Sequence, residues 1–297
     1  MDFVSHMTLQ TTAMTVALGL SLLSPAQVAD RASGAVVVSR QGTIRVTHAT
    51  AYVVRDQRNA RQTSTELLLS DVPVDPTIIR ASLNPHMEAI NVEPLKDRNY
   101  VLLWVTADGS VSMNATFSKT MTQFIDDTTG GLNVTWTTRS ASRLEGRVVT
   151  RTPVKTMDGT TYTVDITFGV DVPPAPAGTA LPAGGGDAGR ALQKLIDAAN
   201  AKNWTGIRAA LSPGALKTFD KSYNSPAENA EDAADLLKAW LPVDKMKIVG
   251  GQLQGDVAIL DVEGEMFPGQ ASLSLARMVK VGATWLFDQA ARAGMLK

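Results

Sequence analysis

Cysteine is absent from all 297 residues of the chain. Structural disulfides, thiolate zinc sites, iron–sulfur clusters and cysteine nucleophiles are therefore excluded by composition. The absence does not fix the compartment, because exported domains of this size can be stable without disulfide bridges.

An excess of charge of either sign is also missing, because the net charge is −1. Residues 30–172 carry 15 basic and 15 acidic side chains, and residues 187–297 carry 13 of each. No basic face is implied that would hold a phosphate backbone, so we expect no nucleic-acid partner. The sequence has no phosphate loop, dinucleotide fingerprint, nucleophile elbow or zinc-protease helix, and we expect no cofactor.

Residues 13–23 form an apolar run of signal-peptide length, which is too short to span a bilayer. Small residues suited to cleavage follow this run as far as Ala29. We predict a signal peptide over residues 1–29, a periplasmic or secreted protein, and no integral membrane segment in the mature chain. Because no lysine or arginine precedes Arg31, a buried N-terminal helix is the alternative.

A stretch rich in proline and glycine, DVPPAPAGTALPAGGG, occupies residues 171–186. Its composition disfavours a helix interior or a paired strand. We predict a linker over residues 173–186, extended at its prolines and flexible at its three final glycines. It divides the chain into a domain of residues 30–172 and a domain of residues 187–297, and it favours two independent binding units over a site between them.

The first domain is predicted to be an all-β antiparallel sandwich or barrel. In the clearest strand, Tyr162, Val164, Ile166 and Phe168 alternate with polar residues, as the two-residue period of a strand requires. Asp108-Gly109 predicts a hairpin turn. The other predicted strands are residues 35–39, 43–54, 65–69, 100–106, 111–117, 132–138 and 143–150.

Two further features of the first domain are local. Asp75-Pro76 predicts the start of a short helix, which Asn84-Pro85 is expected to end. His48 and His86 have no acidic residue at ligand spacing, so we interpret them as structural or surface histidines. Arginines at positions 139, 143, 147 and 151 predict a modest basic stripe along a strand face, with Glu145 on the opposite face.

The second domain is predicted to be α+β, with its helices on one face of an antiparallel sheet. Helices are expected after Asp187, Asn203, Ser212 and Ser225, each of which is a suitable N-cap residue. Beyond Pro242 the apolar period changes to that of strands, which we place at residues 245–253, 256–266, 271–280 and 283–288.

Two resemblances to known families follow from short motifs. The motifs of the second domain are Ala191-Leu192 and Trp204, Leu211-Ser212-Pro213, Gly255-Asp256-Val257-Ala258, and the run from Gly282 to Asp288. This pattern resembles the nuclear transport factor 2-like superfamily, which implies a cystatin-like α+β cone that holds ligands in some members and dimerises in others. The first domain, at residues 48–52, 67–73 and 146–148, resembles an uncharacterised β-rich domain of exported bacterial proteins, which implies no known activity.

Candidate site residues lie in the predicted cone. The ligand-pocket candidates are Trp204, Trp240, Trp285, Phe287 and Asp261, although the aromatic side chains also suit a core. Asp261, Glu263 and Glu265 alternate with apolar residues, and we interpret this row as a solvent-facing edge.

Two functions from different classes remain open. The first is an exported, non-catalytic protein of a bacterial envelope that binds a small molecule or an envelope protein, with a possible homodimer through the C-terminal sheet. The second is a small-molecule isomerase, dehydratase or hydrolase that uses a carboxylate of Asp256, Asp261 or Asp288. The enzyme requires one of these carboxylates to point into a closed apolar pocket of the cone.

Overall fold

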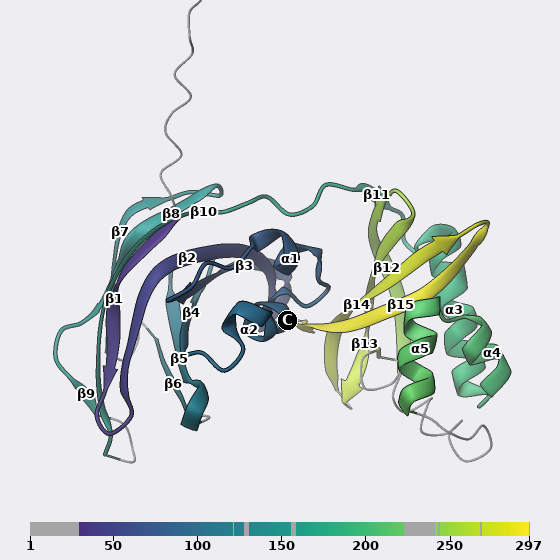
Figure 1. Cartoon of the computed structure of the whole chain (residues 1–297). Helices are drawn as coiled ribbons and strands as arrows, with labels where there is room; N and C mark the ends of the chain where they lie inside the picture. The colour runs from purple at the N-terminus through teal and green to yellow at the C-terminus, as the bar shows by residue number, and fades with distance from the viewer. Residues whose placement is uncertain are drawn as a thin grey trace, which may run out of the picture.

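The computed structural model describes residues 30–120, 122–127, 131–155, 159–222, 241–242, 244–267 and 269–296. The predicted signal peptide, the helix expected after Ser225, and Trp240 lie outside the described residues. Most of the described chain forms two antiparallel sheets, accompanied by a few short helices (Figure 1). None of the helices in this part of the chain is long and apolar enough to cross a membrane.

The first sheet is a single curled sheet of ten strands in the order β6-β5-β4-β3-β2-β1-β10-β8-β7, with β9 paired to β10. The antiparallel β structure is confirmed, but the strands form one curled layer instead of two stacked sheets. The sequence analysis missed β6 and the two-residue β9. The strands are β1 (Arg31–Val38), β2 (Gly42–Asp56), β3 (Asn59–Ser70), β4 (Tyr100–Val105), β5 (Val111–Phe117), β6 (Thr122–Asp127), β7 (Leu132–Arg139), β8 (Arg143–Thr150), β9 (Val154–Lys155) and β10 (Thr161–Asp171).

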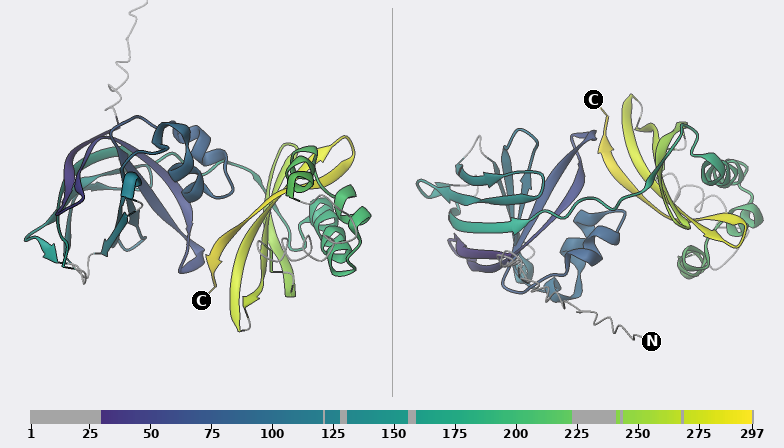
Figure 2. Two further views of the ribbon diagram at one scale, coloured as in Figure 1. Left: turned by 60° about the horizontal axis from the view of Figure 1, so that its bottom comes forward. Right: turned by 90° about the horizontal axis from the view of Figure 1, so that it is seen from above.

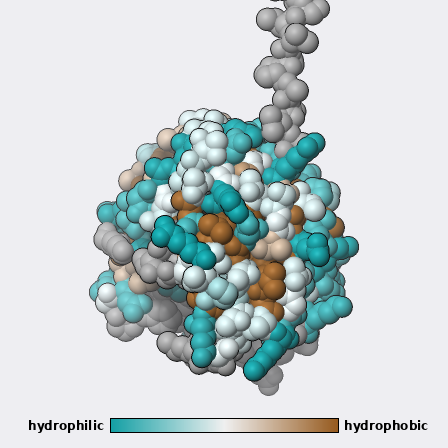
Figure 3. Space-filling model, turned by 90° about the vertical axis from the view of Figure 1, so that its left-hand side faces the viewer, coloured by the Kyte–Doolittle hydropathy of each residue, from teal (hydrophilic) through white to brown (hydrophobic). Residues whose placement is uncertain are grey.

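One face of the curled sheet encloses its own apolar core. The four inward residues of β10 predicted from the alternation are all buried in it, together with side chains from β5 and β7 near the two ends of the sheet. Trp136 packs edge-on against Phe168, with 5.8 Å between the ring centroids. On the side of the molecule that carries β1 and β7, Figure 3 shows a small apolar patch surrounded by hydrophilic side chains.

Two short helices cover the other face of β2, β3 and β4. They are α1 (Pro76–Ala81) and α2 (Pro85–Asn91), followed by the 3-10 turn η1 (Glu93–Leu95); a second such turn, η2 (Ser118–Thr120), follows β5. Asp75 accepts the amide hydrogen of Thr77, which confirms the predicted helix start. The helix ends at Ala81, ahead of Asn84-Pro85 as expected, but the Asn84 side chain then accepts from Met87 and begins α2, which the sequence analysis did not predict. Both helices begin with proline at the first helical position, where the missing amide hydrogen costs nothing.

The second sheet has the order β11-β12-β13-β14-β15, and its helices lie on the face away from the curled sheet (Figure 1). Leu192, Leu195 and Ile196 of α3 form a core with Leu260 and Val262 of β13. The predicted caps at Asn203 and Ser212 are confirmed by their bonds to Gly206 and Ala215. The elements are β11 (Thr179–Leu181), α3 (Gly186–Asn200), α4 (Trp204–Ala209), α5 (Pro213–Ser222), β12 (Asp244–Gln254), β13 (Val257–Phe267), β14 (Gln270–Val281) and β15 (Thr284–Met295).

The segment predicted as an unpaired linker is partly ordered by hydrogen bonds. Residues 179–181 form β11, which pairs with β12, although proline and glycine flank them. Gly185, with a φ of 66°, occupies the N-cap of α3, so the prediction of Asp187 as the cap was wrong. The Gly184 amide donates to the Ile248 carbonyl, which fixes the glycines predicted as a flexible joint against β12.

Candidate functional site

The aromatic residues predicted for a ligand pocket lie mostly in the core beneath the helices of the second sheet. Trp204 packs on Phe219, with 5.0 Å between ring centroids, and the Arg208 guanidinium lies 5.9 Å from the Trp204 ring. Phe287 is buried, and Trp285 is half-buried against the same core. These contacts show that the aromatic side chains pack the core on the helix-covered face of the sheet.

Two of the three carboxylates considered for catalysis are also placed outside a closed pocket. Asp256 is exposed at the turn before β13. Asp288 accepts from the Ser212 hydroxyl at 2.6 Å and from Arg277 Nε at 2.8 Å. Because the Ser212 hydroxyl also caps α5, this network holds the helix against β15.

Asp261 lies on the sheet face opposite the helices and points toward the curled sheet. Its carboxylate is 3.4 Å from Arg55 at the end of β2, and Glu263 is 3.1 Å from Arg61 at the start of β3. Two carboxylates of the row predicted as a solvent-facing edge are therefore ion-paired with the β2–β3 hairpin. The third, Glu265, pairs with Lys245 of β12 at 2.7 Å. Burial raises the pKa of Asp261, while the Arg55 guanidinium lowers it and the charge of Glu263 raises it.

A second contact joins the same elements. The Met295 amide at the end of β15 donates to the Gln57 carbonyl in the turn between β2 and β3, at 3.1 Å. The views in Figure 2 show the C-terminal end of β15 reaching the tip of this hairpin. The two sheets thus meet at the hairpin, and a space remains between them beside it.

This space is a cleft of about 890 Å³, which we call the inter-sheet cleft. The β2–β3 hairpin and the α1–α2 pair line one side, β13, β14 and β15 line the other, and residues 173–176 complete the wall. Arg80 Nη2 donates to the Pro174 carbonyl at 2.7 Å and holds that segment against α1. The lining combines apolar side chains, among them Leu83, Ile259 and Leu275, with charged side chains.

Glu66 is the most deeply buried charged group of the cleft wall, with 1% of its surface exposed. Three side chains contact its carboxylate. The Tyr52 hydroxyl donates at 2.9 Å to Oε2, Trp104 Nε1 donates at 2.6 Å to Oε1, and His86 Nδ1 lies 3.1 Å from Oε2. A carboxylate removed from water needs such donors, because an unpaired buried charge costs several kcal/mol.

Strand register and a helix cap bring these four side chains together. Tyr52 and Trp104 are the direct cross-strand neighbours of Glu66 on β2 and β4, so all three side chains share one face. The Asn84 cap begins α2 over this face and places His86 above Glu66, where its ring stacks on Trp104 at 5.8 Å. Burial, and then the charge of Glu66, raise the pKa of Tyr52 well above its usual value of 10.0.

His86 connects the buried carboxylate to the cleft. Its side chain is 23% exposed and lines the cleft, and Nε2 lies on the edge of the ring away from the Glu66-bound Nδ1. Nε2 has no hydrogen-bond partner among the described residues. The interpretation of His86 as a lone structural histidine was therefore incomplete, because Glu66 lies beside it in space though not in sequence. No cluster of three histidine, aspartate or glutamate side chains suited to a metal ion occurs in the described part of the chain.

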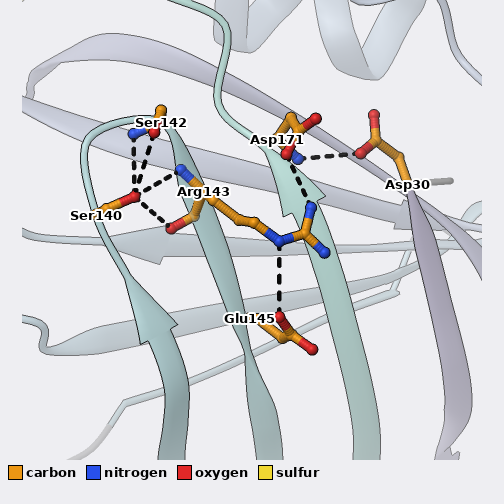
Figure 4. Close-up of polar contacts among 6 residues, drawn as sticks. All are labelled: Asp30, Ser140, Ser142, Arg143, Glu145 and Asp171. Atoms are coloured by element: carbon orange, nitrogen blue, oxygen red, sulfur yellow. Dashed lines mark hydrogen bonds and ion pairs between the residues drawn. The ribbon is translucent and has the colours of Figure 1, made fainter. Parts of the chain in front are cut away.

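Two of the four arginines of the predicted basic stripe, Arg143 and Arg147, form ion pairs within the curled sheet. Arg143 Nη1 is 2.8 Å from Asp171, whose amide donates to Asp30, and Arg143 Nε is 3.6 Å from Glu145 (Figure 4). Arg147 forms two bonds with Asp165, at 2.7 and 2.8 Å. The placement of Glu145 on the opposite face was wrong, since residues two apart in a strand share a face. At these two positions the stripe thus offers ion pairs within the sheet instead of an anion site.

A second, more apolar cleft of about 640 Å³ lies between α2, α5 and β15. Phe287 contributes to its wall with Phe219, whereas Trp204 and Trp285 line neither cleft. Asn84 and Met87 line both clefts, so α2 lies between them. No protein-family model and no curated protein sequence matches the chain, and the function is therefore argued from the geometry alone.

Proposed function

We propose that this chain is an exported, two-domain protein that binds a small organic ligand in the inter-sheet cleft. The second domain in this proposal is a nuclear transport factor 2-like cone, and the first is the curled sheet with α1 and α2. The observation that carries the proposal is the fully buried Glu66, whose three donors include a histidine that lines the cleft. The proposal moves the binding site from the interior of the cone to its outer face.

Burying a carboxylate costs free energy because the charged group loses its hydration, so such a group is an unfavourable means of stabilising a sheet. Apolar residues of similar volume often stabilise a fold as well as, or better than, a buried polar network. The Glu66 network does something that apolar packing does not, because it fixes the orientation of an imidazole at a cleft wall. Titratable groups with perturbed pKa values, such as Tyr52 in this network, gather at binding and catalytic sites.

The size and lining of the cleft support the same conclusion. Small-molecule sites commonly enclose about 300–1,000 Å³ and combine apolar walls with a few placed polar groups. The inter-sheet cleft has about 890 Å³, apolar side chains from both sheets, and the His86 ring. The alternative enzyme is less well supported, because Asp256 is exposed and Asp261 is paired with Arg55. Asp288 lines the second cleft, but its carboxylate is held by Ser212 and Arg277.

Native mass spectrometry of the full chain purified from its own host tests the proposal. We expect a bound small molecule on the wild-type protein. Leu275→Arg, which fills the cleft from β14, should lose it, while Val281→Arg, which adds the same side chain at an exposed position of β14, should retain it. Both variants are first checked for folding by circular dichroism.

Two results contradict the binding proposal: a wild-type chain without any adduct, and an adduct that survives Leu275→Arg. Export is tested separately by sequencing the N-terminus of the protein secreted by its host. The apolar run of residues 13–23 supports a cleaved signal peptide, and a mature chain that still begins at Met1 contradicts it.

A further inference from the structure

We propose that the ligand of the inter-sheet cleft is a small organic anion, a carboxylate or phenolate on an apolar body, whose anionic group binds Nε2 of His86. This inference rests on the proposed function and names the class of ligand for that site. The charges of the cleft, the orientation of the His86 ring and the apolar side chains beside that ring support it.

The charged side chains of the lining favour an anion. Three are cationic (Arg55, Arg80 and Arg292) and two are anionic (Glu66 and Asp261). The Glu66 carboxylate is already occupied by its three donors, and that of Asp261 is paired with Arg55. Neither carboxylate is therefore available to hold a cationic ligand.

The imidazole is prepared to receive the anion. Its Nδ1 is held by Glu66 and its ring by the stack on Trp104, so Nε2 keeps one direction relative to the wall. On binding, the acid form of the ligand transfers its proton to Nε2, which then donates it in a hydrogen bond to the resulting anionic oxygen. The complex then holds an imidazolium between the Glu66 carboxylate and the anionic group of the ligand, with no bond formed or broken apart from this proton transfer.

The side chains next to His86 suit an apolar body. Met87 follows it on α2 and is 47% exposed, which is unusual for a large apolar side chain. Leu83 lies on the same side of the cleft, and Ile259 and Leu275 lie on the opposite sheet. An acid with its anionic group on His86 can therefore bury its hydrocarbon part among these residues.

The test uses the full chain and a matched pair of probes, 4-phenylbutyrate and its neutral primary amide. Calorimetry should show that the wild type binds the acid more tightly than the amide. His86→Gln should weaken acid binding about tenfold or more, because a charge-assisted hydrogen bond contributes about 1.5–3 kcal/mol. Binding of the amide should change little, and His48→Gln, at a half-buried histidine outside the cleft, should leave both probes unaffected.

Imidazole nitrogen resonances give a second readout on the wild-type chain, which contains three histidines in all. Adding the acid should shift the Nε2 signal of His86 toward the protonated form and leave that of His48 in place. The inference is overturned if the amide binds as tightly as the acid, if His86→Gln binds the acid normally, or if the wild type binds no acid. If it fails in these ways while a native adduct is still lost in Leu275→Arg, the proposed function stands and only the ligand class is wrong.

Discussion

Arg55 and Asp261 lie 206 residues apart in the chain, and their side chains meet at 3.4 Å between the two sheets. Arg61 and Glu263 repeat the contact two residues further along β13. Since strand residues two apart share a face, the hairpin and β13 form matched rows of opposite charge. These rows border the inter-sheet cleft and help to set the separation of its walls.

The Arg55–Asp261 pair should contribute a small, salt-dependent free energy. Both side chains are partly exposed, at 34% and 25%, so a double-mutant cycle with Arg55→Ala and Asp261→Asn should give a coupling of about 0.5–1 kcal/mol at low salt. Urea unfolding at about 0.05 M and about 0.5 M salt should show the coupling fall at the higher concentration. The well-exposed Lys96–Glu93 pair is the control and should show no coupling. A coupling that does not depend on salt would contradict a solvent-screened pair.

The Asp261 carboxyl should titrate above the ordinary aspartate value of 3.8, because burial raises its pKa more than Arg55 lowers it. Arg55→Ala should raise this pKa further, and carbon NMR of the carboxyl measures both values. Because the folded state then binds this proton more tightly, the contribution of Asp261 to the free energy of unfolding should fall as the pH rises from 3.8 through the raised value. The wild type minus Asp261→Asn difference in unfolding free energy isolates this contribution. Asp261→Asn should lack this fall, and a pKa that drops in Arg55→Ala would refute the explanation.

Tyr52 should remain protonated in the folded protein well above pH 10, since burial and the Glu66 charge raise its pKa. In the unfolded chain the Tyr52 hydroxyl ionises near pH 10, so the free energy of unfolding should fall as the pH rises above that value. Tyr52→Phe should cost about 1 kcal/mol at neutral pH, from the lost bond to Glu66, and should be less sensitive to alkali. Tyrosine absorbance during an alkaline titration measures this, and ionisation of all four tyrosines near pH 10 in the folded protein would contradict it.

Gly189 should tolerate no larger residue. A Cβ atom there would lie 1.9 Å from the Gly184 carbonyl oxygen, so Gly189→Ala must displace the backbone that begins α3. We expect a loss of at least about 2 kcal/mol in urea unfolding. Gly214→Ala in α5 is the control, because its nearest neighbour is 3.6 Å away, and it should be neutral or stabilising by about 0.5–1 kcal/mol. Equal effects of the two substitutions would show that the close approach at Gly189 is unimportant.

Local patterns predicted the elements of this fold well. The alternation in β10, the Asp108-Gly109 hairpin and the caps at Asp75, Asn203 and Ser212 all depend on residues near each other in sequence. The pairing of β11 was missed because proline and glycine on either side outweighed the three residues that pair with β12. Whether the strands stack or curl depends on how the whole sheet twists, which no single strand encodes.

The candidate site could not be predicted in the same way. Glu66 meets Tyr52, His86 and Trp104 at separations of 14, 20 and 38 residues, which only strand register and the α2 cap bring together. One signal was present, since Glu66 directly precedes three leucines in a run suited to a buried strand. A charged residue in such a run indicates that the fold must supply donors for it. The contacts of Asp261 were likewise beyond local reasoning, because its partner belongs to the other sheet.

The pairing of β11 has a practical consequence for dissecting the protein. This strand precedes α3 but protects one side of β12, whose amides and carbonyls would otherwise form an open edge. A fragment cut at Asp187 would keep α4, α5 and all but the first residue of α3, yet it would expose the unpaired edge of β12 to other copies of itself. A fragment that begins ahead of Thr179 should instead stay dispersed, so the first autonomous unit of this half starts within the proline-rich stretch.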